Sequence, residues 1–177
     1  MILRQLSPDD LPAYRQLRLF SIVDSPASIA ASYEEEAAVP LEQMAQRLLP
    51  TPQQAVFGAF DGTALVALAG FRRERSAKLR HRGDIWGVYV APAARGTGLS
   101  RALMAALLAH VRTLAGVVLV KLSVRADNDA ARALYRRLGF ELTGVDTRSL
   151  CVDGVYHDEE RMQLALDTDT TTTGEAA

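Results

Sequence analysis

The sequence predicts an α/β protein built on a mixed β-sheet. Its first half reads as a short strand, two helices and then a run of strands, two of which are joined by a hairpin signal. Its second half alternates between helical and strand periodicity. The length of 177 residues suits one domain with one substantial core, and hydrophobic residues make up 49% of the chain.

The N-terminal third reads as a strand followed by helices. Residues 2–6 form a short strand candidate, and the segment Ser7-Pro8-Asp9-Asp10 then offers a hydroxyl cap, an early proline and first-turn acids, which predict a helix start. A second helical or irregular stretch between Pro26 and Pro40 contains the acidic run Glu34-Glu35-Glu36. Residues 41–49 form a short helix that Pro50 stops.

The remaining elements follow from turn signals and periodicity. Asp61-Gly62-Thr63 separates two apolar runs and predicts a hairpin, whereas Gly139 marks the C-cap of a helix. The predicted strands cover residues 55–60, 64–71, 85–90, 117–124, 140–146 and 155–166, and the predicted helices cover 98–114 and 128–138. We expect a single domain over residues 1–166 and a disordered, threonine-rich tail over 167–177.

Charge is distributed unevenly along a chain whose net charge is only -1. Residues 71–137 carry fourteen of the 20 basic residues but only four of the 21 acidic ones. One interpretation is a set of solvated faces that differ by chance; the other is a middle segment built around an anionic ligand, with flanks that suit a cationic one. The near-zero net charge gives no reason to expect nucleic acid or an anionic membrane as a partner.

Cysteine and histidine are scarce. The single Cys151 excludes an intrachain disulfide, and three His give no metal-ligand cluster, so no metal is expected. The N-terminus lacks the basic-then-apolar layout of a signal peptide, and the apolar run around residues 115–120 is too short to span a bilayer. We therefore expect a cytoplasmic protein without a membrane partner.

The most informative segment connects a predicted strand to a predicted helix. Pro92 ends the strand, and Gly96 and Gly98 allow backbone N–H groups to converge on a ligand close to the helix N-terminus. Arg95 and Arg101 add positive charge, which indicates a diphosphate site. The Rossmann fingerprint would need a third Gly at Arg101, and the Walker loop would need Gly-Lys-Ser/Thr, so neither fits.

Two motifs resemble the GCN5-related N-acetyltransferase (GNAT) superfamily. The loop Arg95-Gly96-Thr97-Gly98-Leu99-Ser100 is similar to its pyrophosphate loop, Gln/Arg-x-x-Gly-x-Gly/Ala, and departs from it at Ser100, which is still small. The family motif Asn-x-x-Ala-x-x-Leu-Tyr-x-x-x-Gly-Phe is matched without a break by Asn128, Ala131, Leu134, Tyr135, Gly139 and Phe140. Weaker resemblance extends over residues 4–166.

The resemblance implies a GNAT-type mixed, mostly antiparallel sheet flanked by helices. It also implies an enzyme that uses acetyl-CoA, without metal or covalent acetyl-enzyme, and moves the acetyl group directly to a primary amine of a small molecule or peptide terminus. The implied cofactor contacts are Val88, Val90, Arg95, Gly96, Thr97, Gly98, Leu99, Ser100, Arg101, Asn128 and Tyr135.

Several side chains are candidates for the chemistry. By resemblance, the Tyr135 hydroxyl points at the thioester sulfur, where it could act as general acid; a core aromatic is the alternative. Asn128 contacts the pantetheine arm by resemblance, or simply caps the helix. Asp84 stands where one branch of the family carries its general base, although a solvated strand-start charge is an equal alternative. The acids Glu34–Glu36 are alternatives as general base, and Glu34 and Glu35 could receive the acceptor ammonium; an exposed acidic turn is the other interpretation.

A second function remains open from the sequence alone. A CoA-binding module without turnover, acting as a sensor or partner, would keep the phosphate loop; the intact Tyr135 favours the enzyme. The resemblance implies that the residues that select the acceptor lie in the N-terminal helices and last strands, which vary within the family, so it predicts an amine partner but not its identity. Many members of the family are dimers, which leaves a homodimer as an open alternative.

Overall fold

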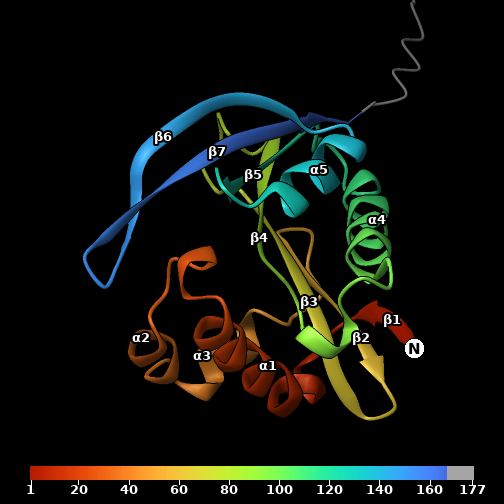
Figure 1. Ribbon diagram of the computed structural model, residues 1–177. Coiled ribbons are helices and arrows are strands. Elements are labelled where there is room, and N and C mark those ends of the chain that lie inside the picture. Colours follow the sequence, from red (N-terminus) through yellow and green to blue (C-terminus); the bar gives the residue numbers. More distant parts are fainter. Residues whose placement is uncertain (167–177) are drawn as a thin grey trace, which may run out of the picture.

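The structure is a computed structural model that describes residues 1–166 (Figure 1). The predicted tail over 167–177 lies outside the described residues. The elements run in the order β1 (Ile2–Gln5), η1 (Pro8–Asp10), α1 (Leu11–Asp24), η2 (Pro26–Ser28), α2 (Tyr33–Ala37), α3 (Leu41–Gln46), β2 (Gln54–Asp61), β3 (Ala64–Arg73), β4 (Arg82–Val90), η3 (Pro92–Ala94), α4 (Leu99–Arg112), β5 (Leu119–Arg125), α5 (Asp129–Arg137), β6 (Glu141–Val152) and β7 (Val155–Ala165).

One mixed sheet organises these elements and confirms the predicted fold class. Its seven strands follow the order β1-β2-β3-β4-β5-β7-β6, and every neighbouring pair is antiparallel except β4 and β5. A parallel pair needs a crossover connection, which η3 and α4 supply here. The sheet is therefore interrupted in its middle by one parallel junction.

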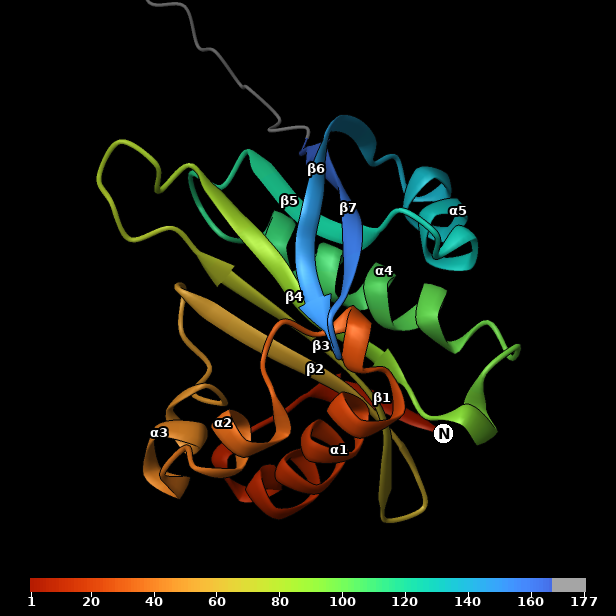
Figure 2. The same cartoon turned by 60° about the vertical axis from the view of Figure 1, so that its left-hand side comes forward.

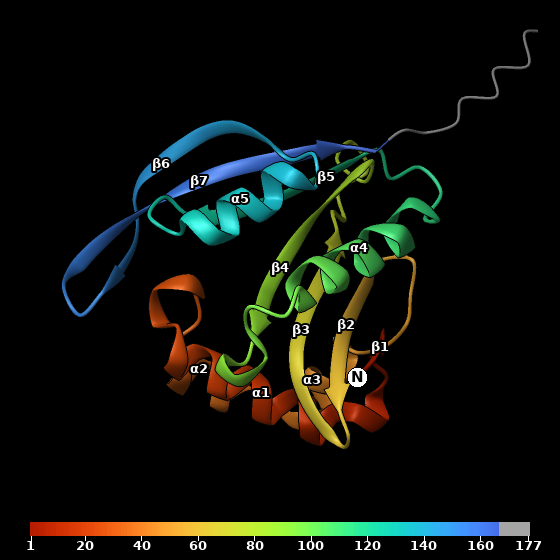
Figure 3. The same cartoon turned by 45° about the vertical axis from the view of Figure 1, so that its right-hand side comes forward.

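The parallel junction is short. Only Arg82–Asp84 of β4 pairs with Leu119–Lys121 of β5, although both strands continue beyond these residues. Figure 3 shows the two strands diverging after this contact. Strands that stop pairing expose backbone groups and leave space between them, which is where a ligand can enter the sheet.

Helices cover the two faces of the sheet and create two cores. Leu103, Leu107 and Val111 of α4 pack with one face, whereas Tyr14 and Leu17 of α1 pack with the other. Alternation along the strands sends successive side chains to these opposite cores. Figure 2 shows the segment between α1 and α2 rising toward the β6–β7 hairpin, and η2 contacts both β5 and β6.

Element boundaries differ from the predicted ones mainly where polar residues continue a structure. The first helix starts as the 3-10 turn η1 and continues as α1 to Asp24. Strand β6 extends to Val152 rather than ending at residue 146, because it is an edge strand whose mostly exposed side chains lack the apolar alternation used for the prediction.

Candidate active site

A narrow cleft of about 90 Å³ opens where β4 and β5 separate. Strand β4 adds a bulge at this point, since Gly87 and Val88 stand opposite the single residue between Leu68 and Gly70 of β3, and Gly87 has a φ of +62°. The cleft is lined by Ser28 of η2, Trp86, Gly87 and Val88 of β4, Ser123 and Arg125 of β5, Asn128, Tyr135 of α5 and Glu159 of β7, among others.

Tyr135 lies in the wall of this cleft. Its side chain is 6% exposed and makes an edge contact with Phe140, with ring centroids 5.9 Å apart. Burial raises the pKa of Tyr135 to about 12. The hydroxyl therefore keeps its proton at neutral pH and is available as a hydrogen-bond donor to a ligand in the cleft.

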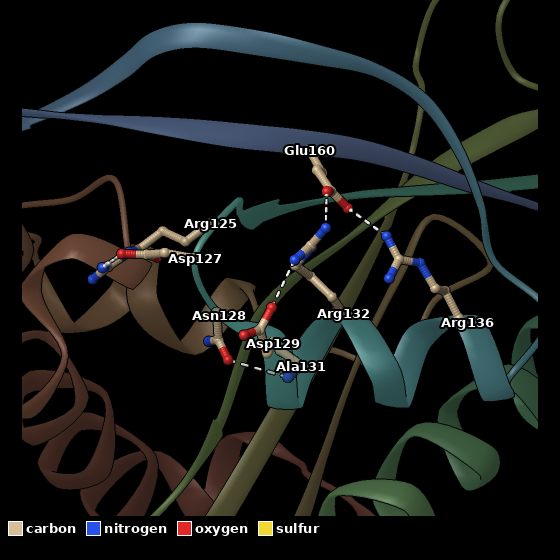
Figure 4. Close-up of polar contacts among 8 residues, drawn as sticks. All are labelled: Arg125, Asp127, Asn128, Asp129, Ala131, Arg132, Arg136 and Glu160. Atoms are coloured by element: carbon tan, nitrogen blue, oxygen red, sulfur yellow. Dashed lines mark hydrogen bonds and ion pairs between the residues drawn. The ribbon is translucent and has the colours of Figure 1, made fainter.

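Helix α5, which carries Tyr135, is fixed by a cap at its N-terminus and by two arginines that reach Glu160 of β7 (Figure 4). Asn128 is its N-cap, and the Asn128 Oδ1 accepts the Ala131 N–H at 3.1 Å. Glu160 of β7 is 5% exposed; Arg132 binds one of its oxygens, and the Arg136 Nη2 lies 3.3 Å from the other. Asn128 thus serves as a cap and also lines the cleft, so the two predicted roles are compatible.

The turn before α4 contains two glycines in the left-handed backbone region. Gly96 and Gly98 have φ values of +77° and +82°, and a Cβ built on either would meet nothing within 4 Å. The Ala102 N–H bonds to the Gly98 carbonyl at 3.1 Å, and the N–H groups before it form the open first turn of α4. That turn has no acidic residue, which suits an anion.

Side chains of the loop are partly committed to the protein itself. The Thr97 Oγ1 donates to the Ala94 carbonyl at 2.8 Å. The Arg95 Nε donates to the Val90 carbonyl at 2.9 Å, and the Arg95 guanidinium also binds Asp24 at the end of α1. The Tyr89 hydroxyl donates to the same Asp24 carboxylate at 2.9 Å. Arg95 therefore ties the loop to α1 in this structure, and Arg101 is exposed at the first turn of α4.

The predicted acids are not among the residues that line the cleft. Asp84 sits at the closed end of the β4–β5 junction, where its Oδ1 is 3.5 Å from the Lys121 Nζ. Glu34 is exposed, and Glu35 accepts the Ser32 N–H at 2.9 Å as part of a capping box. The third acid of the run, Glu36, is 4% exposed and is held by arginines, so it is a structural residue.

Glu159 is not among the predicted site residues, but the structure brings it to the cleft. Glu159 pairs with Arg125 across β5 and β7, and its Oε2 accepts a hydrogen bond from the Ser149 hydroxyl at 2.5 Å. Arg125 itself is neutralised by Asp127, with the Nε 2.7 Å from the Oδ1 (Figure 4). The usable signal was strand alternation, since Glu159 and Arg161 face away from the core that buries Glu160 and Met162.

Two negative findings concern residues 1–166. Within this range, no group of three or more His, Cys, Asp or Glu side chains is placed to hold a metal ion. Over the same range, none of the helices combines the length and the apolarity that crossing a membrane requires. Cys151 is exposed and free on β6.

Comparison with known families decides the classification. The sequence model of the "Acetyltransferase (GNAT) family" matches residues 18–140, which is more than half of the chain. The chain belongs to the GNAT acetyltransferase family. Acetyl-CoA is accordingly the expected co-substrate of this GNAT protein, and the predicted family membership is confirmed.

Individual relatives agree with this classification. The GNAT domain is 39% identical to the N-alpha-acetyltransferase RimI of Mycobacterium tuberculosis over 61% of this chain, and it spans 65% of that relative's length. It is 28% identical to a ribosomal-protein-alanine N-acetyltransferase from Brucella melitensis, with a TM-score of 0.78 and coverage of 94% of this chain and 100% of that one. A protein from Salmonella typhimurium, solved with its cofactor acetyl-CoA, shares the fold with a TM-score of 0.79 at 23% identity, covering 95% of each chain.

Proposed function

We propose that this GNAT protein transfers an acetyl group from acetyl-CoA directly to a primary amine of a small molecule or peptide terminus, with a preference for α-amines. One observation carries the proposal: the buried Tyr135 lines the cleft that opens where β4 and β5 separate. The relatives named for N-alpha and ribosomal-protein-alanine acetylation support the α-amine.

The residues present fit acetyl-CoA. The open first turn of α4 with Gly96 and Gly98 suits the diphosphate, because nothing blocks approach to its N–H groups. The bulge at Gly87 and Val88 frees backbone groups of β4 beside the cleft, where an N–H can stabilise negative charge on the acyl oxygen. Val90 is less available, since its carbonyl already accepts from Arg95.

Bound acetyl-CoA supplies an activated thioester. The amine nitrogen forms the new C–N bond as the C–S bond breaks, and the Tyr135 O–H donates to the departing sulfur. Complete proton transfer from a phenol of pKa about 12 to a thiolate with a reference pKa of ~8.5 is uphill by ~5 kcal/mol. Tyr135 therefore acts chiefly as a hydrogen-bond donor to the leaving sulfur. The proton lost by the amine finally protonates the CoA thiolate to give the free thiol.

The acceptor must lose a proton before it attacks. A lysine-like amine of pKa ~10.4 is neutral in only about one molecule in 2,500 at pH 7, whereas an α-amine near ~8 is neutral in roughly one in ten. We assign the base to Glu159, the carboxylate in the cleft, with Asp84 acting through water as the alternative. One carboxylate is an adequate general base for an α-amine and a poor one for a lysine ε-amine, which supports the proposed preference.

A panel of amines tests this function. We expect acetyl-CoA-dependent formation of an N-acetylated product with at least one α-amino peptide, and a lower kcat/KM for a blocked peptide that offers only a lysine ε-amine. The rival function is a CoA-binding sensor without turnover. It would be supported by tight acetyl-CoA binding without release of the CoA thiol for any amine.

A further inference from the structure

An arginine-rich recess of about 430 Å³ lies on the sheet face that α1 and α3 cover. It shares Trp86 with the cleft that opens between β4 and β5, so the two spaces meet at this one side chain. The recess is lined by Arg18, Glu36, Gln43, Gln46, Arg47 and Trp86, together with Gln54, Arg72 and Arg75. Its lining thus contains four arginines and a single carboxylate.

The single carboxylate does not neutralise the arginines. The Glu36 Oε1 lies 3.4 Å from the Arg18 Nε and 2.5 Å from the Arg47 Nη1, so one charge is shared between two cations. Arg72 and Arg75 form no ion pair with any of residues 1–166. Asp84, the cross-strand neighbour of Arg72, is paired with Lys121. The recess therefore keeps a net positive charge.

Arg18 has a buried donor that Glu36 does not satisfy. The residue is 7% exposed, and its Nε lies within ion-pair distance of Glu36, but its Nη1 has neither a hydrogen-bond acceptor nor an ion-pair partner among the described residues. Buried guanidinium donors without acceptors cost free energy, because the group has given up its water. The guanidinium lies 5.8 Å from the Trp86 ring centroid, and the Nη1 approaches the bulge at Gly87. The unpartnered donor thus lies beside the cleft.

Trp86 is held flat at the junction of the two spaces. A Cβ at Gly70 of β3 would lie 2.3 Å from the Trp86 ring, so only glycine allows the indole to rest on this strand. The Arg18 guanidinium also lies over this ring. Because both spaces are lined by Trp86, a molecule whose amine reaches Gly87 could extend past the edge of this ring into the recess.

We propose that the recess binds an anionic group, a carboxylate or a phosphate, on the acceptor whose amine is acetylated. The inference rests on the proposed function and narrows it to amines that also carry a negative charge. Arg72 and Arg75 at the rim and Arg18 at the wall would pair with that anion, since charge-assisted bonds from arginine are the strongest available here.

Matched peptides test the inference without altering the reacting amine. We compare Ala-Glu-amide with Ala-Gln-amide, and Ala-phosphoserine-amide with Ala-Ser-amide; the arm with the larger ratio identifies carboxylate or phosphate. Wild type should favour an acidic member by about tenfold in kcat/KM, the expected size of one charge-assisted bond, and added salt should reduce this ratio. The double variant Arg72→Gln/Arg75→Gln should bring the ratio below about threefold while acetyl-CoA affinity is unchanged.

The control is Arg112→Gln, an exposed arginine on α4 across the sheet, which should keep the wild-type ratio. Equal kcat/KM values for acidic and neutral members in wild type would overturn the inference while leaving the acetyltransferase standing. If no amine is acetylated, the proposed function fails. Calorimetry with Ala-Glu-amide and Ala-Gln-amide then tests separately whether the recess binds an anion. Tighter binding of the acidic peptide that Arg72→Gln/Arg75→Gln abolishes would support it, and equal binding would overturn it.

Discussion

At the scale of single residues, the Tyr135 hydroxyl is the group whose removal is most informative. Tyr135→Phe keeps the ring and its contact with Phe140. Because the hydroxyl serves mainly as a hydrogen-bond donor to the leaving sulfur, we expect kcat to fall by about 10²-fold, the lower end of the usual range for acid catalysis, while acetyl-CoA binding is kept. Stopped-flow and calorimetric measurements check both parts. A fall below about threefold, with chemistry rate-limiting, would show that solvent protonates the thiolate.

The same hydroxyl predicts a dependence of stability on alkaline pH. The pKa of Tyr135 is raised to about 12 by burial, against a reference of ~10. A raised folded-state pKa contributes stability that is complete below pH ~10 and is lost as the pH rises toward 12, by ~2–3 kcal/mol at most. Denaturant unfolding from pH 9 to 12 should therefore show a shallower loss in Tyr135→Phe than in wild type. Tyr156→Phe, at an exposed site on β7, is the control and should match wild type.

The choice of base is also a question of single residues. If Glu159 accepts the amine proton, Glu159→Gln should lower kcat/KM by about 10²-fold at pH 7. In this variant kcat/KM should still rise with pH toward the pKa of the amine itself. Asp84→Asn should change the profile little, because Asp84 is paired with Lys121 outside the cleft. The opposite result, with the profile altered only by Asp84→Asn, would return the role to Asp84.

Local motifs revealed some of these residues and could not reveal others. Tyr135 and Asn128 share one helix and its cap, so spacing along the chain placed them together. Glu159 reaches the cleft only because β7 pairs with β5, and Arg18 meets Trp86 only through packing of α1 on the sheet. Such contacts depend on register and layer packing, which a single sequence does not encode locally.

At the scale of elements, the strand-to-helix turn before α4 carries the cofactor claim. Gly98→Asp adds a carboxylate in open space at the helix N-terminus, where it competes with the diphosphate. We expect acetyl-CoA affinity to fall by more than about tenfold, with a cost in stability of only ~1–2 kcal/mol from the positive φ. Calorimetry and thermal unfolding measure the two effects.

Gly62→Asp is the matched control for that variant. Gly62 has a φ of +58° and equally open surroundings, but it lies in the β2–β3 hairpin turn. The same substitution there should impose a similar strain and leave acetyl-CoA affinity unchanged. Equal affinity in both variants and wild type would remove the phosphate-site assignment from the α4 turn.

Boundaries of elements were predictable where chemistry is local. The cap at Asn128 and the stop at Gly139, whose φ is +92°, follow directly from residue type. The long edge strand β6 was predicted too short, because exposed polar residues carry no alternation signal.

The homodimer, which the sequence left open as an alternative, stays a prediction.

At the scale of the whole molecule, the site depends on one junction in the sheet. β4 and β5 pair over three residues each and then diverge, so the cleft exists only because the crossover through α4 joins two antiparallel halves in parallel. The order of elements predicted the fold class, but the length of that junction is a property of the assembled sheet. The positive recess likewise gathers residues from α1, α2, α3 and three strands.

Amine-dependent release of the CoA thiol, followed in parallel with mass spectrometry of the acceptor, tests the central claim most directly. With an α-amino peptide and acetyl-CoA, we predict equal amounts of thiol and N-acetylated product, and a rate that falls by about 10²-fold in Tyr135→Phe. Thiol release that is independent of the amine, or acetyl-CoA binding with neither product, would contradict the account and favour a sensor.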